Sequence, residues 1–213
     1  CHAAIIAREL GIPAVVGVAG AQDILADGTP VTVSCAEGET GRIRAGILPF
    51  AVEPVVLDAA RPPKPHLLVN IADPARAFRT ATLPVDGVGL ARIEFIITQH
   101  IGIHPMALVA PERVESARTR ARIARMTAGT KTGADFFVNR LAEGVGVIAA
   151  AFYPRPVIVR MSDFKTNEYR ALLGGEAFEA AEENPMIGFR GASRYVHPDY
   201  APAFALECRA LAH

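Results

Sequence analysis

The pattern that most constrains the fold lies in the later two thirds of the chain, where short apolar runs alternate with helical segments. β-type runs fall within residues 67–71, 87–95 and 156–161, and the last is nearly all apolar, as in a strand buried on both faces. Helical patterns cover residues 111–127 and 134–151. This alternation predicts parallel β/α units. Three such units do not close a barrel, which needs eight strands.

A smaller α-plus-β piece precedes these units. Residues 1–10 have apolar side chains at helical spacing, and Gly11 is suited to end that helix. The β-type runs at 14–18 and 31–35 follow, and the chain returns through 42–45 after a glycine-containing turn. We therefore expect a compact first domain that ends near residue 46.

A proline-rich segment separates the two parts. Residues 61–65 contain three prolines, which lack backbone N–H donors and favour an extended, semi-rigid linker. We place the first domain at residues 1–46, the linker at 47–65 and the second domain at 66–213.

Charge and composition exclude several classes of function. The chain has 22 basic and 22 acidic residues, so nothing in its net charge favours nucleic acid or an anionic membrane as a partner. No apolar run approaches the roughly 20 residues that span a bilayer. Three cysteines without pairing spacing (Cys1, Cys35 and Cys208) indicate a reducing compartment, so we expect a soluble cytoplasmic protein. Cys208 has core spacing in the last helical pattern and is expected to be buried.

The two ends of the sequence look cut. The first residue is Cys1 and not methionine, and residues 204–213 stop within an apolar helical pattern. We therefore expect an internal fragment of a longer protein.

His2 lies at the amino end of the first predicted helix, where free backbone N–H groups and the helix dipole favour an anion. An imidazole with a pKa of roughly 6.5 is mostly neutral at pH 7, so one ring nitrogen can attack a phosphoryl group. Position alone would favour a cap or surface role for this histidine.

Two arginines lie where predicted strands end. Arg92 lies at the exit of the second β-run and Arg160 ends the third. Barrels of parallel strands place their active sites at this edge, and a guanidinium can hold a phosphate or carboxylate through two hydrogen bonds. Arg92 could instead be a surface residue paired with Glu94. Two arginines at successive strand ends converge on one anion more plausibly than either binds it alone.

Arg190 lies in a loop with Asn184-Pro185 and two glycines, Gly188 and Gly191, and a helical segment follows it. Glu182 and Glu183 could simply pair with it. We reject these two carboxylates as a metal pair, because adjacent carboxylates in a loop are usually solvated. The remaining histidines lack metal or acid–base spacing and are expected on the surface or in core packing: His66, His100, His104 and His197.

Four segments together resemble the phosphoenolpyruvate-utilising enzymes. These are residues 1–17, which resemble the phosphohistidine signature, and residues 87–95, 156–169 and 182–195. The resemblance implies the C-terminal part of a swivelling phosphohistidine domain, followed by the first strands and helices of an incomplete (β/α)8 TIM-type barrel.

The resemblance also assigns roles to the candidate residues. It implies that His2 is the catalytic phosphorylated histidine. Arg92 and Arg160 would contact the substrate, and Arg190 would present a further guanidinium to the phosphoryl group.

The segment 162–169 resembles the branch of the family that forms phosphoenolpyruvate from pyruvate, ATP and water, in gluconeogenesis. The alternatives are a sister enzyme such as pyruvate phosphate dikinase, or a truncated non-catalytic protein that binds phosphoenolpyruvate. The resemblance implies that the ATP-binding domain, the rest of the barrel and the Mg²⁺ ligands lie outside this chain. We expect a homo-oligomeric parent enzyme, no complete dikinase activity in this chain alone, and self-association of its open sheet.

Overall fold

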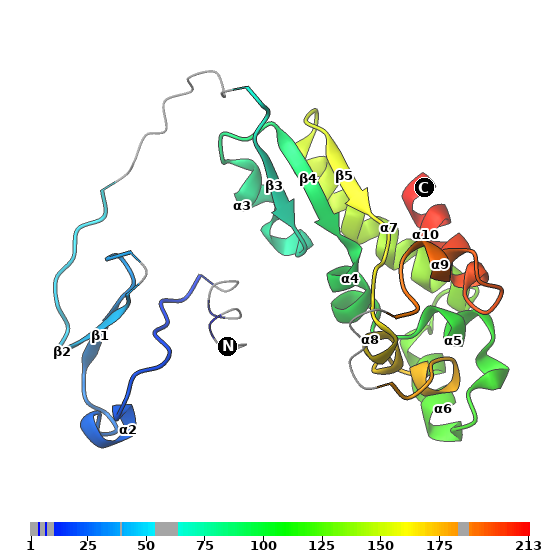
Figure 1. The fold of residues 1–213 in the computed structure, drawn as a ribbon, viewed down its shortest axis with the longest axis horizontal. Coiled ribbons are helices and arrows are strands. Elements are labelled where there is room, and N and C mark those ends of the chain that lie inside the picture. The colour runs from blue at the N-terminus through cyan, green and yellow to red at the C-terminus, as the bar shows by residue number, and fades with distance from the viewer. Residues whose placement is uncertain (1–3, 5–6, 8–10, 39, 54–63, 183–187) are drawn as a thin grey trace. The chain divides into compact units, whose positions relative to one another are not determined.

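The computed structural model describes residues 4, 7, 11–38, 40–53, 64–182 and 188–213. The chain divides into two compact units, Cys1–Val56 and Leu57–His213, which are described separately (Figure 1). His2 and most of the helix predicted over residues 1–10 lie outside the described residues, as does most of the proline-rich segment.

The first unit contains a short helix and a two-stranded antiparallel hairpin. The helix α2 (Ala21–Ile24) precedes β1 (Val31–Ser34), which pairs with β2 (Arg42–Ala45). The hairpin confirms the predicted chain reversal. The strand prediction over residues 14–18 is wrong, because Gly17 adopts a left-handed backbone conformation with φ 73° that interrupts the extended run.

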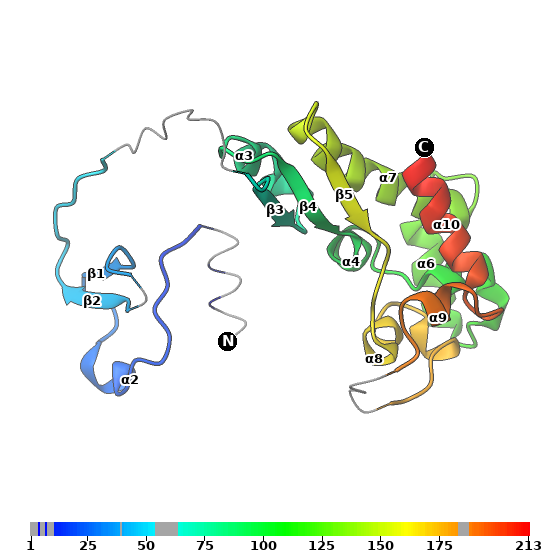
Figure 2. The same cartoon turned by 45° about the horizontal axis from the view of Figure 1, so that its top comes forward.

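The second unit contains a three-stranded parallel sheet. Its strands are β3 (Leu68–Ile71), β4 (Gly87–Arg92) and β5 (Val157–Arg160), and β4 lies in the centre (Figures 1 and 2). The structure therefore confirms a mixed α/β fold with parallel strands. Gly87 permits the close approach of β4 to β5, because a side chain there would lie 2.4 Å from the carbonyl oxygen of Pro156.

Helices cover one face of this sheet. The long helix α7 (Gly133–Phe152) packs against β4 and β5, and also against α3 (Ala77–Ala81). The other elements of this unit are η1 (Pro74–Arg76), α4 (Ile93–Ile96), the π-helix η2 (Ile97–Ile101), α5 (Pro105–Val109), η3 (Pro111–Arg113), α6 (Ala117–Met126), α8 (Thr166–Arg170), η4 (Gly175–Ala177), α9 (Ala192–Tyr195) and α10 (Ala201–Ala212).

Local side chains determine where the longer helices begin. Thr132 caps α7 by accepting a hydrogen bond from the backbone N–H of Asp135 at 3.0 Å. The helix predicted from residue 111 begins only at Ala117, because Ser116 accepts from the backbone N–H of Thr119 and so caps α6. Such a cap contributes about 1 kcal/mol to stability.

No helix in the described part of the chain combines the length and apolarity needed to cross a membrane.

The prediction that Cys208 is buried is wrong. The helix α10 buries Ala203, Leu206, Glu207 and Ala210, which follow the spacing of one helix face. Cys208 lies off this face, and its thiol is free and exposed.

The sheet leaves apolar side chains exposed on the face that the helices do not cover. Val69 and Val159 pack against the buried core. Their strand neighbours Leu68 and Ile158 point to the other face, because side chains alternate along a strand, and they are 38% and 55% exposed. Exposed apolar side chains on an open sheet favour association with another surface.

We predict that a polypeptide of this 213-residue sequence self-associates through this face. Substituting Ile158→Lys should shift its elution in size-exclusion chromatography toward the monomer, since the charge opposes stacking of two such faces. The matched control is Val196→Lys, an exposed apolar position outside the sheet, which should leave the elution unchanged. A monomeric unsubstituted chain at micromolar concentration would contradict the prediction.

Candidate functional site

Arg92 and Arg160 lie opposite each other at the ends of two neighbouring strands. Arg92 is the last residue of β4 and Arg160 the last of β5, and the two are register partners in the parallel pairing. The carboxyl ends of parallel strands meet at one edge of a sheet, so both guanidinium groups belong to that edge. Each arginine is followed by a short helix, α4 or α8, at the same end of the sheet (Figure 2).

Glu94 pairs with Arg160 and not with Arg92. Nη2 of Arg160 donates to Oε1 of Glu94 at 2.5 Å, and the same oxygen accepts from the backbone N–H of Asp163 at 3.0 Å. The alternative pairing of Glu94 with Arg92 is therefore not formed. Arg92 is exposed, and its guanidinium has no hydrogen bond or ion pair with any described residue.

Three buried polar atoms near this edge lack a hydrogen-bond partner within the described residues. They are Oε2 of Glu94, Nε of Arg160 and Oδ1 of Asn167 in α8. A buried polar atom without a partner typically costs about 1–3 kcal/mol, so native structures usually satisfy such atoms with a ligand, water or another chain segment.

Arg190 is held by Asp163. Its Nε and Nη2 donate to the two carboxylate oxygens at 2.9 and 2.8 Å, and Nη2 also donates to the backbone oxygen of Asp163 at 3.2 Å. The hydrogen bond from Arg190, aided by the charge of Arg160, lowers the pKa of Asp163 below its ordinary value. The partner of Arg190 is thus Asp163 and not Glu182, while Glu183 lies outside the described residues.

These side chains form one group at the carboxyl edge of the sheet. Two ion pairs, Arg160 with Glu94 and Arg190 with Asp163, are joined by the bond from the backbone of Asp163 to Glu94. Together with Arg92 they are called the strand-end cluster below.

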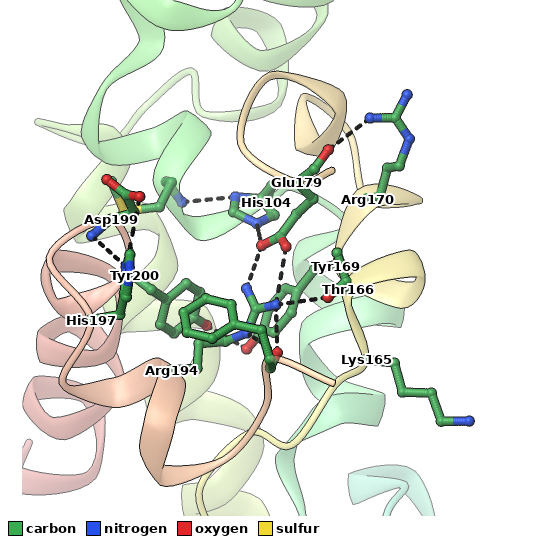
Figure 3. A network of polar contacts seen from close by, with 12 residues as sticks. His104, Lys165, Thr166, Tyr169, Arg170, Glu179, Arg194, His197, Asp199 and Tyr200 are labelled. Carbon is green, nitrogen blue, oxygen red and sulfur yellow. Dashed lines mark hydrogen bonds and ion pairs between the residues drawn. The ribbon is translucent and has the colours of Figure 1, made fainter. Parts of the chain in front are cut away.

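A buried arginine fixes the backbone just before Arg190. Arg194 in α9 is 1% exposed, and its Nε and Nη2 donate to the carbonyl oxygen of Phe189 at 3.0 and 2.8 Å. Its Nη2 also donates to Oε2 of Glu179 at 3.0 Å (Figure 3). Its guanidinium contacts the rings of Tyr169 and Phe189. Arg194 therefore fixes the backbone position of the residue that directly precedes Arg190.

Glu179 also contacts a buried histidine. Nε2 of His104 lies 3.1 Å from Oε1 of Glu179, while Nδ1 of His104 accepts from the backbone N–H of Met106 at 3.2 Å (Figure 3). Because Nδ1 accepts, Nε2 carries the ring proton. Burial lowers the pKa of His104. Burial alone would raise the pKa of Glu179, but the hydrogen bonds from His104 and Arg194 outweigh it, so the pKa lies below its ordinary value.

Four further side chains form a closed, buried cluster, and one of them, Ser162, lies two residues after the end of β5. We call this cluster the hydroxyl ring: Ser162, Tyr169, Tyr200 and Glu207. The hydroxyl of Ser162 contacts that of Tyr169 at 2.6 Å and also contacts the carboxyl of Glu207. The hydroxyl of Tyr200 contacts that of Tyr169 and lies 3.2 Å from the carboxyl of Glu207.

The sequence did not predict the buried contacts among His104, Glu179 and Arg194, nor the hydroxyl ring. His66, His100 and His197 are exposed and His104 lies in the core, as the sequence indicated, but the partner of His104 is 75 residues away. A weak signal for His104 was the following proline: His104 is the N-cap of α5 and Pro105 its first residue.

An open pocket of about 960 Å³ lies elsewhere, between the start of α6 and the segment after α8. Arg113, Ser116, Arg170 and Glu176 are among the residues that line it. The three arginines of the strand-end cluster are not among them, so this pocket and the cluster are separate features.

Within the described residues, no group of three or more histidine, cysteine, aspartate or glutamate side chains could hold a metal ion.

Matches to known proteins cover nearly the whole chain. Residues 56–213 match the family model described as "PEP-utilising enzyme, PEP-binding domain", where PEP is phosphoenolpyruvate, and residues 1–38 match "PEP-utilising enzyme, mobile domain". The chain therefore belongs to the family of phosphoenolpyruvate-utilising enzymes.

Three curated relatives carry the same name. The chain is 60% identical over 211 residues to the phosphoenolpyruvate synthase of Deinococcus radiodurans, covering 99% of this chain and 27% of that protein. It is 53% identical to the phosphoenolpyruvate synthase of Synechocystis and 51% identical to that of Escherichia coli, with 99% of this chain and 26% of each relative covered. The chain thus spans about a quarter of the length of these relatives.

We predict that Arg194→Met destabilises the second unit by about 3–5 kcal/mol, because it leaves Glu179 buried without its cation. The control is Arg209→Met in α10, which removes an exposed ion pair to Asp135 and should cost no more than about 1 kcal/mol. Urea unfolding followed by circular dichroism measures both. Equal unfolding midpoints for the two variants would show that the buried pair does not hold this region together.

Proposed function

We propose that this chain is the part of a longer pyruvate, water dikinase that carries the phosphoryl group and begins the substrate-binding barrel. That enzyme would make phosphoenolpyruvate from pyruvate, ATP and water through a phosphohistidine. The single observation that carries the proposal is the pairing of Arg92 with Arg160 at adjacent strand ends, within the segment that matches the PEP-binding domain. The names of the relatives favour this branch over pyruvate phosphate dikinase.

The charges of the strand-end cluster support an anionic ligand. Arg92, Arg160 and Arg190 bring three guanidinium groups, and Glu94 and Asp163 bring two carboxylates. The lowered pKa of Asp163 keeps its carboxylate ionised at neutral pH. The cluster therefore retains a net positive charge, and Arg92 offers an unengaged planar fork to a phosphate or carboxylate.

The arginines differ in what they can do. Arg92 can donate to an anion without breaking a contact to any described residue. Arg160 keeps one bond to Glu94 and has a buried Nε without a partner in the described residues, so it can orient an anion while remaining fixed. Arg190 is engaged by Asp163 and would have to share or release that carboxylate to reach a phosphoryl group.

In this proposal ATP phosphorylates a neutral imidazole nitrogen of His2, with release of AMP and phosphate and with water as the second acceptor. His2 then passes its phosphoryl group to pyruvate bound at the arginines, and phosphoenolpyruvate is formed. The match of residues 1–38 to the mobile domain supports the carrier role. Residues 1–46 would be the C-terminal part of a swivelling domain, 47–65 a linker and 66–213 the start of a TIM-type barrel. The order of three consecutive parallel strands supports the last assignment.

The remaining parts of the enzyme would lie in other segments of the parent protein. These are the ATP-binding domain, the later barrel strands and the ligands of Mg²⁺, which would offset charge on the transferred group. The chain alone should therefore lack complete dikinase activity. We also propose a cytoplasmic, homo-oligomeric parent enzyme, and the free exposed thiols of Cys35 and Cys208 support a reducing compartment.

We predict that Arg92→Gln in the full-length protein weakens binding of phosphoenolpyruvate roughly 10- to 100-fold, as expected for the loss of charged hydrogen bonds. Stability should not change, because Arg92 contacts no described partner. Isothermal titration calorimetry gives the dissociation constant, and Arg79→Gln, an exposed arginine in α3, is the control. Unchanged affinity in the Arg92 variant would remove this residue from the site.

We predict that His2→Asn abolishes acid-labile phosphorylation of the full-length protein by ATP, since asparagine has no nucleophilic ring nitrogen. His66→Asn should be phosphorylated like the unsubstituted protein. Intact-mass analysis at alkaline and acidic pH measures the modification. Persistent acid-labile phosphate on the His2 variant would assign the carrier to another residue.

A further inference from the structure

The hydroxyl ring consists of four oxygens in a closed cycle. The contacts run from Oε1 of Glu207 to Oγ of Ser162, on to the hydroxyl of Tyr169, then to that of Tyr200, and back to the same Oε1. All four residues are at most 2% exposed, and Glu207 is fully buried. Bulk water therefore does not supply or accept hydrogen bonds around the cycle.

Counting protons shows what the cycle requires. Each contact between two oxygens needs one proton, and each hydroxyl has one to give. If Glu207 is ionised, Ser162 and Tyr200 both donate to it, and Tyr169 must bridge two contacts with a single proton. One contact of the cycle, to Ser162 or to Tyr200, then has no proton between its oxygens. A fourth proton on Glu207 lets every oxygen donate once and accept once.

We propose that Glu207 is a neutral carboxylic acid whose proton completes the hydroxyl ring, and that it acts as a positioning residue for the strand-end arginines. Its Oε2 accepts from the backbone N–H of Ser162 at 3.1 Å. Ser162 lies between Arg160, which ends β5, and Asp163, which holds Arg190 and donates its backbone N–H to Glu94. The positioning role rests on the proposed function, whereas the protonation state does not.

The surroundings favour the neutral acid. Burial raises the pKa of Glu207, and the negative charge of Glu94 from α4 acts in the same direction, against the hydrogen bonds from Ser162 and Tyr200. Tyr195 of α9 donates to the backbone oxygen of Ser162 at 2.7 Å and not to the carboxyl. The buried cation of this region, Arg194, is paired with Glu179.

The pH dependence of stability follows from the raised pKa. The folded state holds the proton of Glu207 at pH values where the unfolded chain has lost it. The contribution to stability is therefore complete below the ordinary pKa of a glutamate, and it declines as the pH rises from there to the pKa of the folded state.

The first test is infrared spectroscopy of the full-length protein at neutral pH. The carbonyl stretch of a protonated carboxyl should be present and should disappear in the Glu207→Gln variant. A spectrum of the unsubstituted protein without that band would overturn the proposal, and so would a band that persists unchanged in the variant.

The second test separates the proton from the carboxyl group itself. In Glu207→Gln, the amide nitrogen can donate to both Ser162 and Tyr200 while the amide oxygen accepts from the backbone N–H of Ser162. All four contacts then keep a proton, and one hydroxyl proton of the ring has no acceptor within it. This variant should be clearly more stable than Glu207→Ala at neutral pH, and its stability should decline less than that of the unsubstituted protein as the pH rises above the ordinary pKa of a glutamate. Glu207→Ala should be destabilised at neutral and at alkaline pH. A Gln variant as unstable as the Ala variant would mean that an ionised carboxylate is required.

The third readout is the affinity for phosphoenolpyruvate. We expect Glu207→Gln to retain it, and a folded Glu207→Ala to bind several-fold more weakly. Equal affinities in all three proteins would overturn the positioning role. If even the unsubstituted protein fails to bind, the proposed function fails, while the infrared result still decides the protonation of Glu207.

Discussion

The arrangement of the strand-end cluster depends on one constraint: two arginines that are register partners on adjacent strands must tolerate each other's charge. Arg92 and Arg160 can lie opposite each other because Glu94 engages Arg160 at 2.5 Å. The same oxygen of Glu94 holds the backbone of Asp163, and Asp163 in turn holds Arg190. The parallel register thus brings the arginines Arg92 and Arg160 together. The two carboxylates pair with Arg160 and Arg190, so the guanidinium of Arg92 has no ion pair with a described residue.

Two buried clusters hold the backbone next to the residues of the strand-end cluster. Arg194, tied to Glu179, fixes the carbonyl of Phe189 directly before Arg190. The hydroxyl ring fixes the backbone of Ser162, which lies in the sequence between Arg160 and Asp163 of the strand-end cluster. When one partner is lost, the other is left buried and unsatisfied, which lowers the stability of the fold. Each cluster is therefore stable only when all of its members are present. Both clusters therefore act on backbone atoms close to the arginines.

The sequence allowed the strands and long helices to be predicted, because these depend on local patterns, and the same patterns placed Arg92 and Arg160 at strand ends. Local patterns predicted two features wrongly. The strand over residues 14–18 is interrupted by the left-handed backbone of Gly17, and Cys208 lies off the buried face of its helix. Local patterns could not predict the partners of the arginines. Glu94 is 66 residues from Arg160, and such a pair depends on how β4 and β5 pack together, which no spacing in the sequence expresses. From the sequence, the expected partners were nearby carboxylates: Glu94 for Arg92, and Glu182 or Glu183 for Arg190. In the structure, Glu94 pairs with Arg160 and Asp163 pairs with Arg190.

A crystal structure of the full-length protein with bound phosphoenolpyruvate tests the central claim most directly. The account predicts that the ligand lies at the carboxyl edge of β3, β4 and β5, with its phosphate or carboxylate oxygens accepting hydrogen bonds from both Arg92 and Arg160. It also predicts that the bond from Arg160 to Glu94 persists. A ligand bound elsewhere, or one that contacts neither arginine, would contradict the account.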